Sequence, residues 1–462
     1  MAFVPAPSGS ARDPGSPALP GPSELIASAV TNRTGRGIAA AVAGLIRSER
    51  LACGTRLPSI RALAMSLHVS ATTVSEAWQM LGSQGMIRTS GRNGTVVLRT
   101  REVPFGTKSR RALWMSGVYG TDLSSGTPDS ALLPSLRQAL EVVATRAGVS
   151  NYNEEPTLPE LADVIRRRWA GVVDPEDLMI TDGAFDAVDR ILRERLRAGD
   201  RVLVEQPTLP SLLDAIEGHG AVAVPVAMDG EGVRPEALRT ALRSRSVMLI
   251  TQPRAQNPTG ISTTPRRMAE IAQIVADTSI LVVEDDHTGE VASASRVSLA
   301  GWIPEQVVYI ESFSKAYGPD LRLAAVGGPA SVLRPIASRR RLGPVWSSRI
   351  LQSLLLQLLR TEDTQESVAR ARATYRQRRR ALQEAVEERG LATTGTEGLN
   401  LWVRVPHENR TLQILAERDI GAAPGSPFFV GTPTGPFLRV TCAALDVTRA
   451  GEVAELIAAA GR

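Results

Sequence analysis

The chain has 462 residues, enough for two or three domains that each bury a sizeable core. Its 43% hydrophobic and 22% charged residues are typical of a soluble globular protein and argue against a fibrous or largely disordered chain. No apolar run approaches the roughly 18 residues that cross a bilayer, and the N-terminus has no secretory pattern. Cys53 and Cys442 match neither a disulfide framework nor a metal site, so we expect a cytoplasmic protein without a bound metal.

The net charge of +5 is concentrated near the N-terminus. Between Ser23 and Thr100, nine Arg face three Glu, so this segment carries +6 and the rest of the chain is nearly neutral. The asymmetry favours a polyanion-binding module attached to a neutral body, and a solvated basic face would explain the charge equally well.

Composition divides the chain into four segments. Residues 1–22 are rich in Pro, Gly, Ala and Ser, which predicts a disordered tail. A compact unit follows over residues 23–99, and residues 100–119 are expected to form a linker. From residue 120 to 462, β-branched runs alternate with amphipathic stretches, which predicts an α/β domain with a smaller C-terminal subdomain from about residue 350.

The compact unit has the pattern of three helices followed by a hairpin. Residues 37–50 show helical periodicity, Ser59 can cap a second helix and Ser70 can cap a third. Residues 86–97 predict a two-stranded wing with a Gly/Asn turn. The order predicts a winged helix-turn-helix, a fold that places its later helix in the major groove of double-stranded DNA.

Three short runs in this unit carry a specific resemblance: LPSIRALA from Leu57, VSATTV from Val69, and GT at Gly94. In these runs the unit resembles the GntR family of regulators. The resemblance implies DNA contacts at Arg61, Ser70, Thr72, Thr73, Gly91 and Arg92. Hydroxyl and guanidinium groups suit contacts to phosphates and base edges. Ala71 and Ser75 stand where many relatives have Arg, so we expect a different or weaker base readout.

In the α/β domain, each predicted strand ends in a cluster of polar residues. We expect strands at residues 178–181, 201–205, 247–251, 280–284 and 307–310. The clusters include TDGA from Thr181, QNPTG from Gln256, EDDH from Glu284 and SFSK from Ser312. Because α/β sheets bind ligands beyond the carboxyl ends of their strands, these clusters are expected to form one site.

One cluster contains a rare lysine. Of 53 basic residues only Lys108 and Lys315 are lysines, so either is a candidate for chemistry that a guanidinium cannot perform, such as imine formation. Chance survival is the simpler explanation for Lys108. Pyridoxal 5'-phosphate (PLP) needs a lysine for its aldehyde, a carboxylate for its pyridine nitrogen and cationic or amide groups for its phosphate. Lys315, Asp285 and Arg322 supply these groups, which predicts a PLP site.

The same positions resemble the fold-type I aminotransferases, and their combination with a GntR-like head resembles the MocR subfamily of regulators. The resemblance implies a mainly parallel sheet and a homodimer. In it, Lys315 corresponds to the lysine of the internal aldimine, Asp285 to the partner of the pyridinium, and Asn257 to the ligand of the ring hydroxyl oxygen. The cofactor-binding residues that it implies are Gly183, Ala184, Asn257, Asp285, His287, Ser312, Lys315, Arg322 and Tyr152, the last reaching the phosphate of the neighbouring subunit. Arg439 corresponds to the arginine that binds an amino-acid carboxylate, here the effector.

Two positions depart from the family pattern. His287 stands where relatives commonly have a tyrosine beside the ring oxygen, and its protonation is expected to change within the physiological pH range. Leu209 stands where an aromatic side chain usually stacks on the ring, and its presence is expected to weaken cofactor binding. We therefore expect sensing, with at most a residual transaminase half-reaction.

The sequence thus predicts a homodimeric, PLP-dependent transcriptional regulator that binds a DNA operator. An amine or amino-acid effector, or PLP itself, would be sensed through the aldimine at Lys315. Two alternatives stay open at this point. One is a functional aminotransferase with a DNA-binding head, and the other is a regulator that has lost PLP and uses the domain to dimerise.

Overall fold

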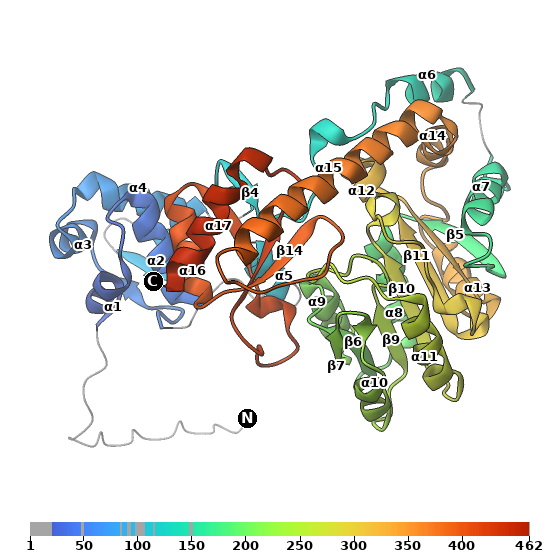
Figure 1. Ribbon diagram of the computed structural model, residues 1–462, viewed down its shortest axis with the longest axis horizontal. Coiled ribbons are helices and arrows are strands. Elements are labelled where there is room, and N and C mark those ends of the chain that lie inside the picture. Colours follow the sequence, from blue (N-terminus) through green and yellow to red (C-terminus); the bar gives the residue numbers. More distant parts are fainter. Residues whose placement is uncertain are drawn as a thin grey trace, which may run out of the picture. The chain divides into compact units, whose positions relative to one another are not determined.

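The computed structural model describes residues 21–47, 50–83, 86–89, 94–97, 107–113, 116–146 and 151–461. The chain forms two compact units, Met1–Arg101 and Glu102–Arg462, which Figure 1 colours in chain order. Residues 1–20 of the expected tail, and Gly91 and Arg92 of the expected wing, lie outside the described residues.

The first unit combines helices with a small antiparallel sheet. Its helices are α1 (Pro22–Ala29), α2 (Gly35–Arg47), α3 (Ile60–Leu67) and α4 (Ala71–Ser83), and its strands are β1 (Arg56–Leu57), β2 (Ile87–Thr89) and β3 (Thr95–Val97). Ser59 caps α3 by accepting a hydrogen bond from Ala62 N (3.2 Å), and His68 ends that helix in the left-handed conformation. β3 pairs with β1 and β2, so the predicted winged helix-turn-helix is confirmed.

The second unit is built on a large, mainly parallel sheet. Its described strands lie in the order β5 (Asp177–Thr181), β12 (Ala324–Gly328), β11 (Val307–Ser312), β10 (Leu281–Asp286), β9 (Met248–Thr251), β6 (Arg201–Gln206), β7 (Val222–Asp229) and β8 (Gly232–Val233). The neighbours from β11 to β7 pair in parallel, whereas β12 is antiparallel to both β11 and β5. All five predicted strands are present.

Helices cover both faces of this sheet (Figure 1). One face packs against α8 (Ala184–Arg195), α9 (Pro210–Gly218) and α13 (Ala330–Arg340), and the other against α10 (Pro235–Leu242) and α11 (Pro265–Ala276). Along β6, Val202 and Val204 are buried under the first group and Leu203 under the second. The strands are therefore apolar on both faces, as parallel sheets covered by helices require.

A smaller sheet lies in the C-terminal subdomain. Its described strands are β13 (Thr393–Thr394), β14 (Asn400–Arg404), β16 (Phe437–Thr441), β15 (Ile420–Pro424) and β4 (Thr121–Leu123), in that order. The accompanying helices are α14 (Arg349–Arg360), α15 (Glu362–Glu387), α16 (Glu408–Glu417) and α17 (Ala450–Ala458), with α6 (Arg137–Arg146), α7 (Pro159–Trp169) and α12 (Ser314–Tyr317) elsewhere in the unit. β4 pairs in parallel with β15, so the start of the second unit also belongs to the small sheet.

The segment expected to be a linker is partly folded into the second unit. Helix α5 (Thr107–Leu113) lies within it, and the backbone N–H groups of Lys108 and Ser109 donate to the Asp214 carboxylate on α9 (3.1 and 2.8 Å). Lys108 Nζ donates to the carbonyl of Phe429 (2.8 Å). The Asp214 carboxylate therefore holds α5 against α9 within the segment expected to be a linker.

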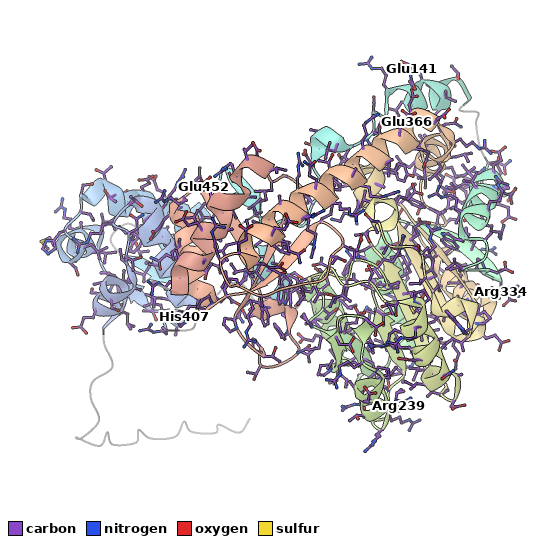
Figure 2. The ribbon with its side chains drawn as sticks, viewed as in Figure 1. Glu141, Arg239, Arg334, Glu366, His407 and Glu452 are labelled. Carbon is purple, nitrogen blue, oxygen red and sulfur yellow. The ribbon has the colours of Figure 1, made fainter. Side chains whose placement is uncertain are left out.

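Within the described part of the chain, no helix combines the length and apolar character needed to cross a bilayer. Exposed arginines extend from the second unit into solvent, such as Arg239 on α10 and Arg334 on α13 (Figure 2).

Candidate functional site

The polar clusters after β9, β10 and β11 meet at the carboxyl edge of the large sheet. Asp285 lies near the end of β10, and Lys315 lies on α12, directly after β11. Gln252 follows β9 immediately, and its Nε2 donates to Asp285 Oδ2 (2.8 Å). The same glutamine accepts a hydrogen bond at Oε1 from Asn257 N (2.9 Å). Gln252 therefore joins two predicted site residues, although the sequence reasoning had not singled it out.

Asp285 presents a buried acceptor with no partner in the described part of the chain. Its Oδ1 atom is buried and makes no hydrogen bond there. Burial raises the pKa of Asp285 to about 6, while the Gln252 hydrogen bond and Lys315 oppose the rise. An unpaired carboxylate oxygen of this kind suits the protonated nitrogen of a pyridine ring. The residue thus fits the role expected of it in a PLP site.

The surroundings of Lys315 favour the neutral form of its amine, compared with a lysine in water. Its Nζ donates to the backbone carbonyl of Gly126 (2.6 Å). Burial lowers the pKa of Lys315 to about 8, the charge of Arg439 lowers it further, and Asp285 opposes both. A neutral amine is the form that attacks an aldehyde, so this environment favours the imine chemistry expected of Lys315.

Gly183, Ala184 and Arg322 surround one cradle at the start of α8. Gly183 is the N-cap residue, with φ of +100°, and Ala184 opens the helix. A Cβ atom on Gly183 would lie 3.2 Å from a terminal nitrogen of Arg322, a tight contact, and the positive φ also favours glycine at this position. Ser312 lies at the end of β11, two residues after Ile310. Helix N–H groups and an exposed guanidinium suit a phosphate group.

Arg439 lies on β16 and is buried without a carboxylate within ion-pair distance among the described residues. One terminal nitrogen donates to Asn257 Oδ1 (3.5 Å), another to the carbonyl of Ser124, and Phe428 lies 5.2 Å below the guanidinium. Burial lowers the pKa of Arg439 to about 10, with Asp122 opposing. A buried cation whose Nε lacks a partner can accept a carboxylate, the role predicted for this residue.

His287 and Leu209, the two positions that depart from the aminotransferase pattern, both lie at the site. Burial and the charge of Lys315 lower the pKa of His287 to about 4. This corrects the expectation that His287 titrates in the physiological range, because the imidazole is neutral there. Its Nδ1 is buried without a partner in the described region. Leu209 is the N-cap residue of α9 and lines a small cavity together with Asp285.

Tyr152 is separate from the other candidates. Its side chain is 89% exposed and packs on Trp346, with ring centroids 6.0 Å apart. Among the described residues, no hydrogen bond joins it to the cluster around Lys315. Its expected role at the phosphate of a neighbouring subunit stays a prediction.

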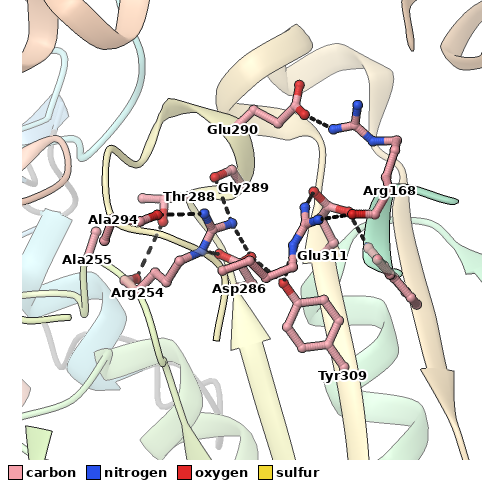
Figure 3. A network of polar contacts seen from close by, with 12 residues as sticks. Arg168, Arg254, Ala255, Asp286, Thr288, Gly289, Glu290, Ala294, Tyr309 and Glu311 are labelled. Atoms are coloured by element: carbon pink, nitrogen blue, oxygen red, sulfur yellow. Dashed lines mark hydrogen bonds and ion pairs between the residues drawn. The ribbon is translucent and has the colours of Figure 1, made fainter. Parts of the chain in front are cut away.

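A buried ionic network lies behind the site on β10 and β11 (Figure 3). Arg254 pairs with Asp286 through two nitrogens, and Tyr309 donates to Asp286 Oδ2 (2.5 Å). Arg296 pairs with Glu311 (2.5 Å), which also accepts from Trp169 Nε1 (2.6 Å). The network fixes the strands that carry Asp285 and precede Lys315. The sequence did not predict this network, because its basic partners come from distant segments.

In the first unit, one DNA-contact candidate, Arg61, lines a surface hollow. Arg61, Met65, His68 and Ala71 line it, and the side chain of Met65 is 72% exposed. Ser70 Oγ accepts from Thr73 N (3.1 Å), so Ser70 caps α4, and its hydroxyl also lies 2.8 Å from Thr73 Oγ1. Thr72 is exposed beside them. Met65 and His68 were not predicted, because an exposed methionine or a helix-ending histidine gives no distinctive pattern.

Residues 34–97 match the model of bacterial regulatory proteins of the gntR family, and residues 119–457 match that of aminotransferase classes I and II. The vitamin B6 salvage pathway transcriptional repressor PtsJ of Salmonella typhimurium is 32% identical over 411 residues, which cover 88% of this chain and 92% of PtsJ. The chain belongs to the MocR-type regulators of the GntR family. Another such relative, the regulator TauR of Rhodobacter capsulatus, is 29% identical over 434 residues, or 83% of this chain and 87% of TauR.

Solved structures agree with the aminotransferase-like part of this MocR-type regulator. LysN, an α-aminoadipate aminotransferase from Thermus thermophilus complexed with N-(5'-phosphopyridoxyl)-L-leucine, aligns with a TM-score of 0.68 and 25% identity. The alignment covers 77% of this chain and 97% of LysN. The regulator thus has a GntR helix-turn-helix and a fold-type I aminotransferase-like domain, and it is a DNA-binding transcriptional regulator by family.

Proposed function

We propose that this regulator binds PLP at Lys315 and that PLP is the signal to which its DNA binding responds. The observation that carries the proposal is the pairing of a buried lysine of lowered pKa with the unpaired Oδ1 of Asp285. Lys315 would hold the aldehyde carbon, Asp285 the ring nitrogen, and Asn257 the ring hydroxyl oxygen. When bound, PLP supplies an electrophilic carbon and a pyridine ring that withdraws electrons.

Four further residues would hold the phosphate from one side of the same edge. Ser312 and Arg322 would donate to it, together with the backbone amides at Gly183 and Ala184. Tyr152 would reach the phosphate of the second subunit of a homodimer. Each of these groups supplies a donor, which matches the charge of a phosphate ester.

PLP itself is favoured as the signal over an amino compound for two reasons. The relative PtsJ is named for vitamin B6 salvage, the class of pathway that a PLP sensor would control. Leu209 also leaves the ring without an aromatic stack, a weaker hold that suits a ligand binding reversibly. Arg439 supports an amino-acid effector as the second candidate, because its guanidinium is buried without a carboxylate partner.

The regulatory claim requires two states that PLP distinguishes. A DNA duplex selected in vitro by the protein should bind with different affinity when PLP is added, as measured by fluorescence anisotropy. Lys315→Ala should bind the same duplex and lose the PLP response. An unchanged response in Lys315→Ala would contradict sensing at this lysine. Rapid conversion of added amino acids by the wild type would instead favour an aminotransferase.

A further inference from the structure

A second buried carboxyl, that of Glu205, lies beside the candidate site but is not among the residues that would hold the cofactor. Glu205 is on β6, and its side chain is 1% exposed. Gln252 connects it with Asp285: the backbone N–H of Gln252 donates to Glu205 Oε2 (3.1 Å), and its side chain donates to Asp285 Oδ2 (2.8 Å). One glutamine therefore fixes the separation of the two carboxyls.

Both carboxyls line the same small cavity. Its volume is about 10 Å³, close to the space that one water molecule needs. Apart from the two carboxyl residues, its walls are formed by Phe185, Val188, Thr208, Leu209, Leu212, Ile250, Thr251 and Gln252. Glu205 Oε1 and Asp285 Oδ1 are both buried without a hydrogen-bond partner in the described region. Glu205 and Asp285 thus line one mostly apolar cavity, and each has a buried oxygen without a partner, a combination that a proton and a water molecule would stabilise.

The surroundings of the two carboxyls give them different pKa values. No cation among the described residues contributes to the pKa of Glu205, and burial raises that pKa to about 8. The hydrogen bond from Gln252 N and the neighbouring Gln256 side chain oppose that rise, while the charge of Asp285 adds to it. Asp285 has the lower pKa of the two, because the hydrogen bond from the Gln252 side chain and the charge of Lys315 favour its charged form, although Asp286 opposes them. At neutral pH, Glu205 therefore holds a proton and Asp285 is ionised.

We propose that Glu205 is a positioning residue for the cofactor, a neutral carboxyl that hydrogen bonds through one water in this cavity to Asp285 and keeps that carboxylate charged. Glu205 Oε2 already accepts from Gln252, so the proton belongs on Oε1. The inference rests on the proposed PLP site, since an ionised Asp285 is what holds the proton on the ring nitrogen.

Two substitutions test whether Glu205 acts as a neutral hydrogen-bond donor, as a charged group or only by filling space. Glu205→Gln keeps a neutral hydrogen-bond donor of the same shape, whereas Glu205→Leu keeps the volume and removes the donor. We expect Glu205→Gln to bind PLP within about twofold of wild type, and Glu205→Leu to bind it about fivefold to tenfold more weakly. Visible absorption of the lysine-bound cofactor should titrate at the wild-type pH in Glu205→Gln and at higher pH in Glu205→Leu, because the ring nitrogen loses positive charge.

Glu284 provides a matched control. It is equally buried on β10, where Ser298 Oγ and Leu299 N donate to it (2.5 and 2.8 Å), and burial raises its pKa to about 7. Glu284→Gln should leave both the affinity for PLP and the absorption titration unchanged. If Glu205→Gln shifts the titration as far as Glu205→Leu, Glu205 is ionised and the inference is wrong. If neither variant differs from wild type, Glu205 does not act on Asp285.

The protein without PLP gives a second readout. Its infrared spectrum should contain the C=O band of a protonated carboxyl that is lost in Glu205→Gln, and this arm holds even if Glu205→Leu does not fold. Absence of that band would overturn the inference while leaving the proposed PLP site intact. A wild type that shows the band but binds no PLP would overturn the proposed function, and the cofactor role of Glu205 with it.

Discussion

Asp285 and Asp286 are consecutive residues of β10 whose carboxylates have separate partners. Asp285 accepts from Gln252 at the candidate site, and Asp286 pairs with Arg254 and Tyr309 behind it. The alternation of a β-strand produces this division, because successive side chains point to opposite faces. One residue is thus available to a ligand, while its neighbour is committed to the fold.

Substitution of Asp285 should therefore affect PLP binding, whereas substitution of Asp286 should affect stability. Asp285→Asn should weaken PLP binding by about 10-fold to 100-fold, because a charge-assisted hydrogen bond is lost, and should change unfolding of the PLP-free protein little. Asp286→Asn leaves Arg254 buried without its carboxylate and should lower stability by about 3–5 kcal/mol. PLP titration and thermal unfolding measure the two effects, and similar results for both variants would contradict the division.

The lowered pKa of Lys315 predicts the pH dependence of PLP capture. The neutral amine reacts, and it predominates above the pKa of about 8 and is lost as the pH falls through that value. The rate of PLP capture by the PLP-free protein, followed by visible absorbance, should rise with pH and level off above about 8. A rate that keeps rising toward pH 10 would show that the site leaves the lysine unperturbed.

His287 should affect stability only in acid. Its folded-state pKa is lowered to about 4, so the unfolded chain binds its proton first as the pH falls below the usual value of about 6.5. The histidine thus reduces stability progressively between about pH 6.5 and 4. His287→Gln should remove that part of the acid loss in urea unfolding and change nothing between pH 7 and 8. Equal pH profiles for the two proteins would contradict the lowered pKa.

Arg61 should contribute to DNA affinity mainly through charge. Arg61→Ala should weaken binding of selected and random duplexes alike, and it should reduce the slope of log K against log salt by about one. The exposed Arg239 on α10 gives a charge-matched control, since Arg239→Ala removes the same charge from the other unit. Loss of binding only for the selected duplex would instead indicate a base contact.

The sequence predicted the elements that have strong periodicity and the residues that follow strands. Its five strands and its helix-turn-helix are present, and Gln252 joins the two predicted site residues Asp285 and Asn257 at one sheet edge. Lys315 follows β11 at the same edge, where its charge interacts with that of Asp285. The strand β12 was missed because its AAVGG sequence has low β-propensity, and it forms only because β5 and β11 pair on either side.

Long-range pairing explains most of what the sequence did not predict. β4 joins a strand from residues 420–424, and α5 is held by Asp214, more than one hundred residues away. The partner of a buried charge is equally hidden: nothing near Asp286 in the sequence indicates Arg254. The expected titration of His287 was wrong for the same reason, since its burial arises from the folded site.

The central claim is that Lys315 holds PLP, and the visible absorption spectrum tests it most directly. Purified protein supplied with PLP should show an absorption band that borohydride reduction fixes covalently, with the label on the peptide that contains Lys315. Lys315→Ala should lack both the band and the label while unfolding at a similar temperature. A wild type that stays colourless with excess PLP, or a Lys315→Ala variant that is labelled equally, would contradict the account.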